Sequence, residues 1–337
     1  MKIQLTHSFE EIVCLENLLT AWKEFEKGKK QKKDVQEFSM RLMDNIFSLH
    51  SDLINHTYNH GGYQAFKIND PKPRDIHKAS VRDRLLHRAV YRVLYPFFDK
   101  TFIADSYSCR NNKGTHKAIR KFQKYANIVS KNNTKTCWIL KCDIKKFFAN
   151  IDHQILLEIL AEYIPDENIL NLLENIIESF PTGLPLGNLT SQLFVNICMN
   201  KFDQFAKHKL KAKHYIRYAD DFVFLSENKN WLEGQIPVIE SFLAKELKLE
   251  LHPDKVFIKT LNSGVDFLGM ISFSDYRILR TKTKRRIIKK LKNKRQELEK
   301  EIISEKTFNQ SLQSYSGILR HCEGYLIERE LGEIGMR

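Results

Sequence analysis

The stretch HYIRYADDFVFL, residues 214–225, places two adjacent aspartates between two apolar runs. Residues 214–218 and 222–225 are rich in aromatic and β-branched side chains, and only Ala219, Asp220 and Asp221 separate them. This spacing predicts a β-hairpin with the acidic pair at its tip. Because adjacent carboxylates repel each other, holding them between buried strands indicates a compensating divalent cation. A polar turn without a metal is the alternative interpretation.

A third carboxylate, Asp143, lies near the end of another strongly apolar run, residues 137–144. If this run neighbours the hairpin in one sheet, Asp143, Asp220 and Asp221 converge on a site for two metal ions about 3.5 to 4 Å apart. Two ions held by carboxylate oxygens suit in-line phosphoryl transfer. Hard oxygen ligands also explain why aspartate, and not cysteine or histidine, occupies these positions.

Composition narrows the class of protein. Of the 337 residues, 55 are basic and 41 acidic, and the formal charge of +14 favours a polyanionic partner such as nucleic acid or an anionic membrane surface. The six cysteines show no Cys-x-x-Cys spacing, which favours reduced thiols over a zinc site or a disulfide framework. Neither a secretory leader nor an apolar stretch of membrane-spanning length is apparent, so we expect a cytoplasmic protein.

Apolar periodicity predicts the order of elements along the chain. Helices are expected within residues 9–58, interrupted by a lysine-rich segment, and at 82–98, 154–163, 168–180 and 232–247. A Gly/Pro loop at 181–187 opens a further helix through Phe202, and short strands are expected within 61–74 and at 256–258 and 265–271. Residues 280–300 contain eleven basic and two acidic side chains, which predicts a helix laid along nucleic-acid phosphates.

Several motifs, in order, resemble those of reverse transcriptases. The sequence YADD at 218–221 resembles their YxDD box, DIKKFF at 143–148 their first palm motif, and VDFLG at 265–269 their palm–thumb element. Upstream, PKPR at 71–74, VRDR at 81–84, SYSCR at 106–110 and KGTH at 113–116 resemble fingers motifs of bacterial group II-like enzymes. The resemblance covers about residues 66–337.

This resemblance implies an α+β, right-hand polymerase fold. We expect an N-terminal helical extension at 1–60, fingers at 61–136 and a thumb of helices at 276–337. The palm, with an antiparallel sheet, is expected at 137–275 and includes some fingers-side helices within 154–185. The implied activity is that of an RNA-directed DNA polymerase, a nucleotidyltransferase that uses two Mg²⁺ ions, dNTPs, a template RNA and a primer.

One departure suggests a subfamily. Most bacterial relatives have the pattern QGxxxSP in the loop that enters the palm helix, whereas this chain has LGNLTSQ at 186–192. This difference, the SYSCR and KGTH motifs, and the segment SYSGILRH at 314–321 are similar to reverse transcriptases of diversity-generating retroelements. Those enzymes make adenine-mutagenised cDNA from a template-repeat RNA (mutagenic retrohoming) and work with a small pentameric helical accessory protein.

Two alternatives remain open. The first is a reverse transcriptase of the abortive-infection type, which acts in antiviral defence. The second is a non-catalytic RNA-binding or maturase-like protein. The intact Asp143, Asp220 and Asp221 argue against a silent protein, and we expect the lack of a zinc-finger or nuclease segment after Arg337 to exclude a complete mobile-intron protein.

The resemblance also implies roles for individual residues. Asp143, Asp220 and Asp221 would bind the metals together with the backbone carbonyl of Ile144, and Lys255 would protonate the leaving pyrophosphate. The nucleotide would contact Lys72 and Arg74 at its phosphates, Phe148 as a steric gate at its sugar, and Leu186, Gly187 and Gln192 near its base. The remaining candidates are basic residues for template and primer phosphates, namely Arg110, Lys113, Lys284, Arg285, Lys289 and Lys292.

Overall fold

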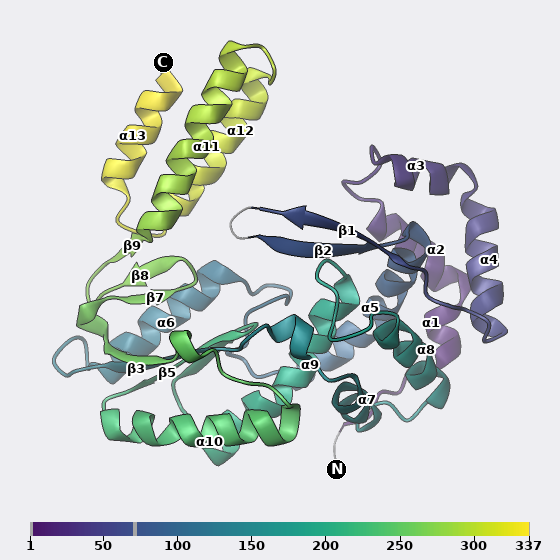
Figure 1. The fold of residues 1–337 in the computed structure, drawn as a ribbon, viewed down its shortest axis with the longest axis horizontal. Helices are drawn as coiled ribbons and strands as arrows, with labels where there is room; N and C mark the ends of the chain where they lie inside the picture. The colour runs from purple at the N-terminus through teal and green to yellow at the C-terminus, as the bar shows by residue number, and fades with distance from the viewer. Residues whose placement is uncertain (1–2, 70–72, 337) are drawn as a thin grey trace.

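A four-stranded antiparallel sheet lies at the centre of the computed structural model, which describes residues 3–69 and 73–336 (Figure 1). Its order is β4 (Tyr215–Tyr218), β5 (Asp221–Ser226), β3 (Trp138–Asp143) and β6 (Phe257–Thr260). The interior positions of β3 and β5 are buried on both faces, which explains why these strands are nearly continuous apolar runs in the sequence. The strands predicted at 137–144, 214–218 and 222–225 are confirmed.

Helices cover both faces of this sheet. On one face α10 (Lys229–Leu247) contacts β3, β5 and β6, and α9 (Leu189–Gln204) lies beside α10 with Phe202 packed on Phe222 of β5. On the other face lies α6 (Thr115–Val129), whose apolar side chains join Ile139, Val223 and Leu225 in a second core. The sequence analysis did not predict α6, although residues 118, 119, 122, 126 and 129 are buried at helical spacing.

The helices predicted near the N-terminus are present. They are α1 (Phe9–Val13), α2 (Leu15–Phe25), α3 (Lys33–Met40) and α4 (Leu42–Ile54), and the lysine-rich segment forms the connection between α2 and α3. Their apolar faces pack against α5 (Val81–Thr101), which also contacts α9. Two further helices, α7 (His153–Ala161) and α8 (Glu167–Glu178), belong to the same core.

A hairpin of β1 (Tyr63–Ile68) and β2 (Arg74–Ala79) extends from this helical region toward the sheet (Figure 1). Its strands are mostly exposed, and their pairing brings Ile68 opposite Arg74. The predicted nucleotide contact Lys72 lies outside the described residues.

The C-terminal part forms its own small core. A three-stranded sheet of β7 (Val265–Phe267), β8 (Met270–Ser272) and β9 (Arg277–Leu279) leads into α11 (Thr281–Glu299), α12 (Glu305–Leu319) and α13 (Tyr325–Met336). The strand region predicted at 265–271 is interrupted at Leu268 and Gly269, whose φ angles of 53° and 87° turn the chain between β7 and β8. In Figure 1 the three helices stand apart from the rest of the molecule beyond β9.

Short helical turns complete the fold. These are η1 (Phe147–Asn150), η2 (Phe205–Lys209), η3 (Pro253–Lys255) and η4 (Leu261–Ser263). Within the described residues, no helix is both long and apolar enough to cross a membrane.

The packing of α6 on the sheet region is open to a direct test. Phe122 is fully buried and its ring lies 5.5 Å from that of Phe267, measured between centroids. Replacing Phe122 by Ala is expected to lower the free energy of unfolding by about 3–5 kcal/mol, because the cavity cannot collapse fully. Denaturant titration measures this change. Lys124→Ala, at an exposed position of the same helix, is the control and is expected to change it by less than about 0.5 kcal/mol.

Candidate active site

The acidic pair lies at the tip of the β4–β5 hairpin, as predicted. Tyr218 pairs with Asp221, so Ala219 and Asp220 form the loop, and Ala219 adopts a φ of 56°. A backbone bond from the amide of Ile144 to the carbonyl of Asp220, 3.2 Å long, ties this loop to the end of β3. The hairpin tip is therefore held both by the pairing of β4 with β5 and by the bond to the segment after β3.

The register of the sheet brings the third carboxylate to the same edge. Asp143 is the cross-strand partner of Asp221 in the antiparallel pair β3–β5, and paired residues point to the same face of a sheet. Lys255 Nζ contacts Asp143 Oδ1 at 2.7 Å, and Lys141 Nζ lies 3.3 Å from Asp221 Oδ2. Two lysines thus balance two of the carboxylates.

Burial and mutual repulsion raise the proton affinity of the acidic pair. Burial raises the pKa of Asp221 to about 7, against the opposing charge of Lys141. Burial and the negative charge of Asp143 also raise the pKa of Asp220, whereas Lys255 and Arg74 lower it. The site therefore concentrates negative charge that its own cations compensate only in part.

The oxygen atoms of these carboxylates are hard ligands, which suit a divalent cation such as Mg²⁺. Asp221 Oδ1 is buried and has no hydrogen-bond partner among residues 3–69 and 73–336. In the arrangement described, however, no group of three or more His, Cys, Asp or Glu side chains in this part of the chain is placed to hold a metal ion. The predicted ligands share one edge, but Lys141 and Lys255 occupy the carboxylate oxygens of Asp221 and Asp143. The oxygen donors and the unpaired Asp221 oxygen nevertheless fit the Mg²⁺ that the sequence resemblance implies.

The predicted nucleotide contacts lie on segments that touch one another. The amide of His77 in β2 donates to the carbonyl of Leu186 at 2.9 Å, and Ile76 lies directly beside Gly187. Gly187 has a φ of 115°, and a Cβ there would lie 2.9 Å from Ile76 Cγ2. Arg74, at the start of the same strand, is exposed and close enough to Asp220 for its charge to affect that carboxyl. Gln192 follows in the first turns of α9.

Phe148, the predicted sugar gate, contacts the loop at 181–187 through its backbone. It is half-buried in η1 and packs edge-on against the buried Phe147, with 5.6 Å between ring centroids. Its carbonyl accepts a hydrogen bond from the amide of Leu184 at 2.7 Å. The loop that contains Leu186 is thus anchored to the segment that contains the predicted sugar gate.

The structure corrects one predicted phosphate contact. The Arg110 side chain is only 6% exposed, and it donates to Asp99 Oδ1 at 2.6 Å and to the carbonyls of Asp99, Ile103 and Ser106. Because its donors point inward, Arg110 stabilises the loop after α5 and does not face a template. Lys113 is half-buried and donates to the carbonyl of Ala104 at 2.7 Å.

The basic helix α11 presents part of its predicted surface. Arg285, Lys289 and Lys292 are exposed, and their spacing places them on one side of the helix. Lys284 is half-buried and forms a 3.8 Å ion pair with Glu330 of α13, so its charge is partly neutralised within the bundle.

Two charged residues at the site were not predicted. The first is Lys141, a residue that is only 8% exposed. It contacts Asp221 and also donates to the carbonyl of Asp266 at 2.8 Å. Its position two residues before Asp143, in an otherwise apolar strand, was the available signal, because a buried lysine needs a partner. The second is Arg217, directly before Tyr218, which is fully buried and paired with Asp203.

The central antiparallel sheet flanked by helices, with acidic residues at one edge, defines a right-hand polymerase fold of the α+β class. The structure of telomerase from Candida albicans in complex with a fragment of telomeric RNA has this fold, with a TM-score of 0.53 and 15% identity over 82% of this chain and 55% of that one. The family model described as "Reverse transcriptase (RNA-dependent DNA polymerase)" matches residues 67–272. The chain belongs to this reverse transcriptase family.

Curated relatives agree with this membership. Protein YkfC of Escherichia coli K12 is 26% identical over 240 residues, which cover 59% of this chain and 62% of YkfC. The group II intron-encoded protein LtrA of Lactococcus lactis is 22% identical over 295 residues, 65% of this chain and 47% of LtrA. The chain therefore spans less than two thirds of the length of these relatives.

A substitution at Gly183 tests how the loop at 181–187 is anchored. It has a φ of 64°, and a Cβ there would lie 2.6 Å from the carbonyl oxygen of Ala149. Gly183→Ala is expected to lower the free energy of unfolding by more than about 1 kcal/mol and to shift the loop away from Phe148. Gly234→Ala, in α10 with open space around it, is the matched control and is expected to raise the same quantity by about 0.5–1 kcal/mol. Equal responses of both variants to denaturant would contradict the anchoring.

Proposed function

We propose that this protein is an RNA-directed DNA polymerase that extends a primer along an RNA template. The observation that supports this most directly is the pairing of Asp143 with Asp221, with Asp220 in the adjoining turn, at the edge of a sheet of the reverse transcriptase family. Carboxylates gathered in this way favour phosphoryl transfer assisted by two Mg²⁺ ions.

When bound, these ions would supply the positive charge that activates the primer hydroxyl and stabilises the leaving pyrophosphate. Asp143, Asp220, Asp221 and the carbonyl of Ile144 are the proposed ligands. Lys255, whose ammonium forms an ion pair with Asp143, is the proposed proton donor to the leaving pyrophosphate.

The proposed substrate contacts lie on the segments around the Ala219–Asp220 turn and on α11. Arg74, with Lys72 assigned from the sequence alone, is proposed to bind the triphosphate, and the half-buried ring of Phe148 to exclude a ribose hydroxyl. Leu186, Gly187 and Gln192 would border the nascent base pair. In this proposal residues 61–136 serve as fingers, 137–275 as palm and 276–337 as thumb, and the exposed Arg285, Lys289 and Lys292 contact template-primer phosphates.

A finer proposal is that the enzyme belongs to a diversity-generating retroelement and copies a template-repeat RNA with errors at adenine. Leu186 supports it, because an apolar side chain cannot replace the hydrogen bonding of the glutamine found at this position in most bacterial relatives. A small pentameric helical accessory protein is the proposed partner. All six cysteines are free, in keeping with a cytoplasmic location.

Replacing Asp220 by Asn tests the polymerase assignment. The substitution keeps the shape of the side chain but removes a charge, so primer extension with Mg²⁺ is expected to fall by roughly 10²- to 10³-fold or more. Affinity for the RNA–primer duplex, measured by fluorescence anisotropy, is expected to stay unchanged. Asp44→Asn, at an exposed position of α4, is the control. Full extension by the Asp220 variant would refute the assignment, and RNA binding without synthesis by the unmodified protein would favour a maturase-like role.

Replacing Leu186 by Gln tests the mutagenic subtype. Restored hydrogen bonding is expected to lower misincorporation opposite template adenine by about tenfold, measured by sequencing the cDNA made in vitro. Leu186→Met keeps the position apolar and is expected to leave the error rate as it is. If the unmodified enzyme copies adenine faithfully, or makes DNA without a template, the defence type of reverse transcriptase replaces this proposal.

A further inference from the structure

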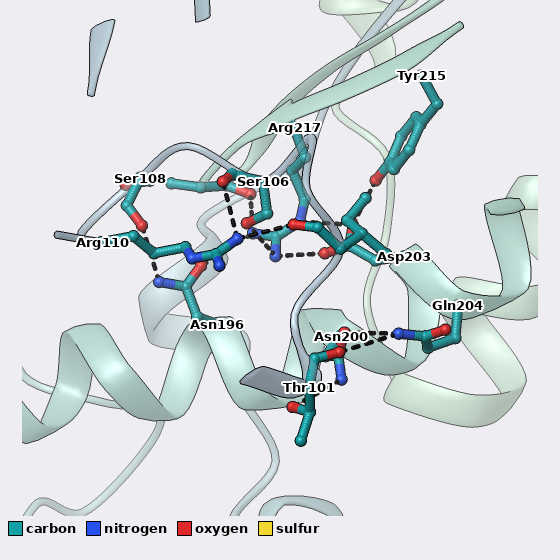
Figure 2. A network of polar contacts seen from close by, with 12 residues as sticks. Thr101, Ser106, Ser108, Arg110, Asn196, Asn200, Asp203, Gln204, Tyr215 and Arg217 are labelled. Atoms are coloured by element: carbon teal, nitrogen blue, oxygen red, sulfur yellow. Dashed lines mark hydrogen bonds and ion pairs between the residues drawn. The ribbon is translucent and has the colours of Figure 1, made fainter. Parts of the chain in front are cut away.

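Among the described residues, Arg217 has the largest side chain that is fully buried. It lies two residues before Ala219, where the acidic turn begins. Its Nε and Nη2 atoms donate to the two carboxylate oxygens of Asp203 at 2.8 and 2.7 Å, which forms a bidentate ion pair (Figure 2). Nη2 also donates to Ser106 Oγ at 3.1 Å. The pair is closed off from solvent, since both side chains are 0% exposed.

The remaining nitrogen of Arg217 contacts the turn itself. Nη1 donates to the carbonyl of Ala219 and to Asn196 Oδ1, each at 3.2 Å. Ala219 is the residue in left-handed conformation that places Asp220 at the tip of the hairpin. Every N–H of the guanidinium thus has an acceptor, and one of these acceptors is the backbone on which Asp220 depends.

Two of the residues that accept from Arg217 belong to one helix, α9. Asn196 and Asp203 lie on the same side of α9, two turns apart, and Figure 2 shows both pointing toward Arg217. Asp203 is held in turn by the hydroxyl of Tyr215 at 2.7 Å, and Asn196 Nδ2 donates to the carbonyl of Ser108 at 2.9 Å. Because α9 begins two residues after Gly187, this network joins the acidic turn to the helix that follows the loop at 181–187.

We propose that Arg217, oriented by Asp203, is a positioning residue that holds the Ala219–Asp220 turn in the conformation needed to bind the metal ions. The inference rests on the proposed polymerase function and adds a device that acts through the backbone and does not touch substrate or metal. A lysine at this position cannot reproduce it, because a single ammonium cannot donate to Asp203 and to Ala219 with the geometry of the planar fork.

A purely structural role predicts a different outcome from a positioning role. Replacing a buried ion pair by apolar residues of similar size often leaves stability unchanged or improved, whereas removing one partner is strongly destabilising. The double variant Arg217→Met with Asp203→Leu therefore separates folding from positioning. It keeps the volume filled but removes the hydrogen bond to the Ala219 carbonyl.

The experiment measures Mn²⁺ binding to the full chain by electron paramagnetic resonance, with Mn²⁺ as the probe, and the Mg²⁺ concentration for half-maximal primer extension. The double variant is expected to unfold at a temperature near that of the unmodified protein and to bind RNA equally well. Its Mn²⁺ dissociation constant and its Mg²⁺ requirement are expected to rise by about tenfold or more, the usual effect of losing a residue that orients metal ligands. Arg217→Lys provides a second test with the charge retained, and the same rise is expected.

Asn200→Ala is the matched control. Asn200 is buried on the same helix, and its hydrogen bonds within the described residues go to Thr101 and Gln204 and not to the turn (Figure 2). It is expected to lower the unfolding temperature without changing Mn²⁺ affinity. Unchanged Mn²⁺ affinity and Mg²⁺ requirement in both Arg217 variants, or the absence of Asp220-dependent Mn²⁺ binding in the unmodified protein, would overturn the proposal. An unmodified protein that binds Mn²⁺ but makes no DNA would refute the polymerase function alone, and the Mn²⁺ affinities would still decide the role of Arg217.

Discussion

The antiparallel pairing of β3 with β5 is the constraint on which the site depends. It sets Asp143 opposite Asp221 and so brings carboxylates that are far apart in the sequence to one edge of one sheet. Because side chains alternate between the faces of a strand, a slip of one residue would turn Asp143 away and would also move Leu140 and Cys142 from one core to the other. Both faces of these strands are buried under helices, so the same packing that stabilises the sheet also specifies this register.

The cations around the acidic edge divide into two kinds by what they contact. Lys141 and Lys255 contact the carboxylate oxygens, so they compete for the same atoms that would coordinate a metal. Arg217 contacts the backbone carbonyl of Ala219 and a separate carboxylate, Asp203. Because Asp203 neutralises its charge, Arg217 contributes a hydrogen bond to the turn and little net charge. The first kind adjusts charge in the site, whereas the second fixes geometry. A site that gathers like charges needs both, because compensation alone does not determine where the carboxylates point.

The hairpin, its acidic tip and the strand that contains Asp143 could be predicted, since local alternation and turn spacing determine them. Helix α6 was also predictable, because its buried residues recur at helical spacing after the KGTH motif in which it begins. The orientation of Arg110 could not be predicted, because charge in a sequence does not indicate whether a guanidinium faces solvent or backbone carbonyls. The partners of Lys141 and Arg217 lie on other elements, so only the tertiary structure reveals them.

The conformation of the loop at 181–187 does not depend on the side chain of Leu186. Its path is fixed by backbone contacts: Leu184 bonds to Phe148, and Leu186 bonds to His77 through its carbonyl. Gly183 and Gly187 adopt positive φ angles at the places where the loop approaches its neighbours most closely. None of these contacts uses the side chain at position 186. On the function proposed above, a change from glutamine to leucine at this position alters what the side chain offers to a base pair and leaves these backbone contacts in place.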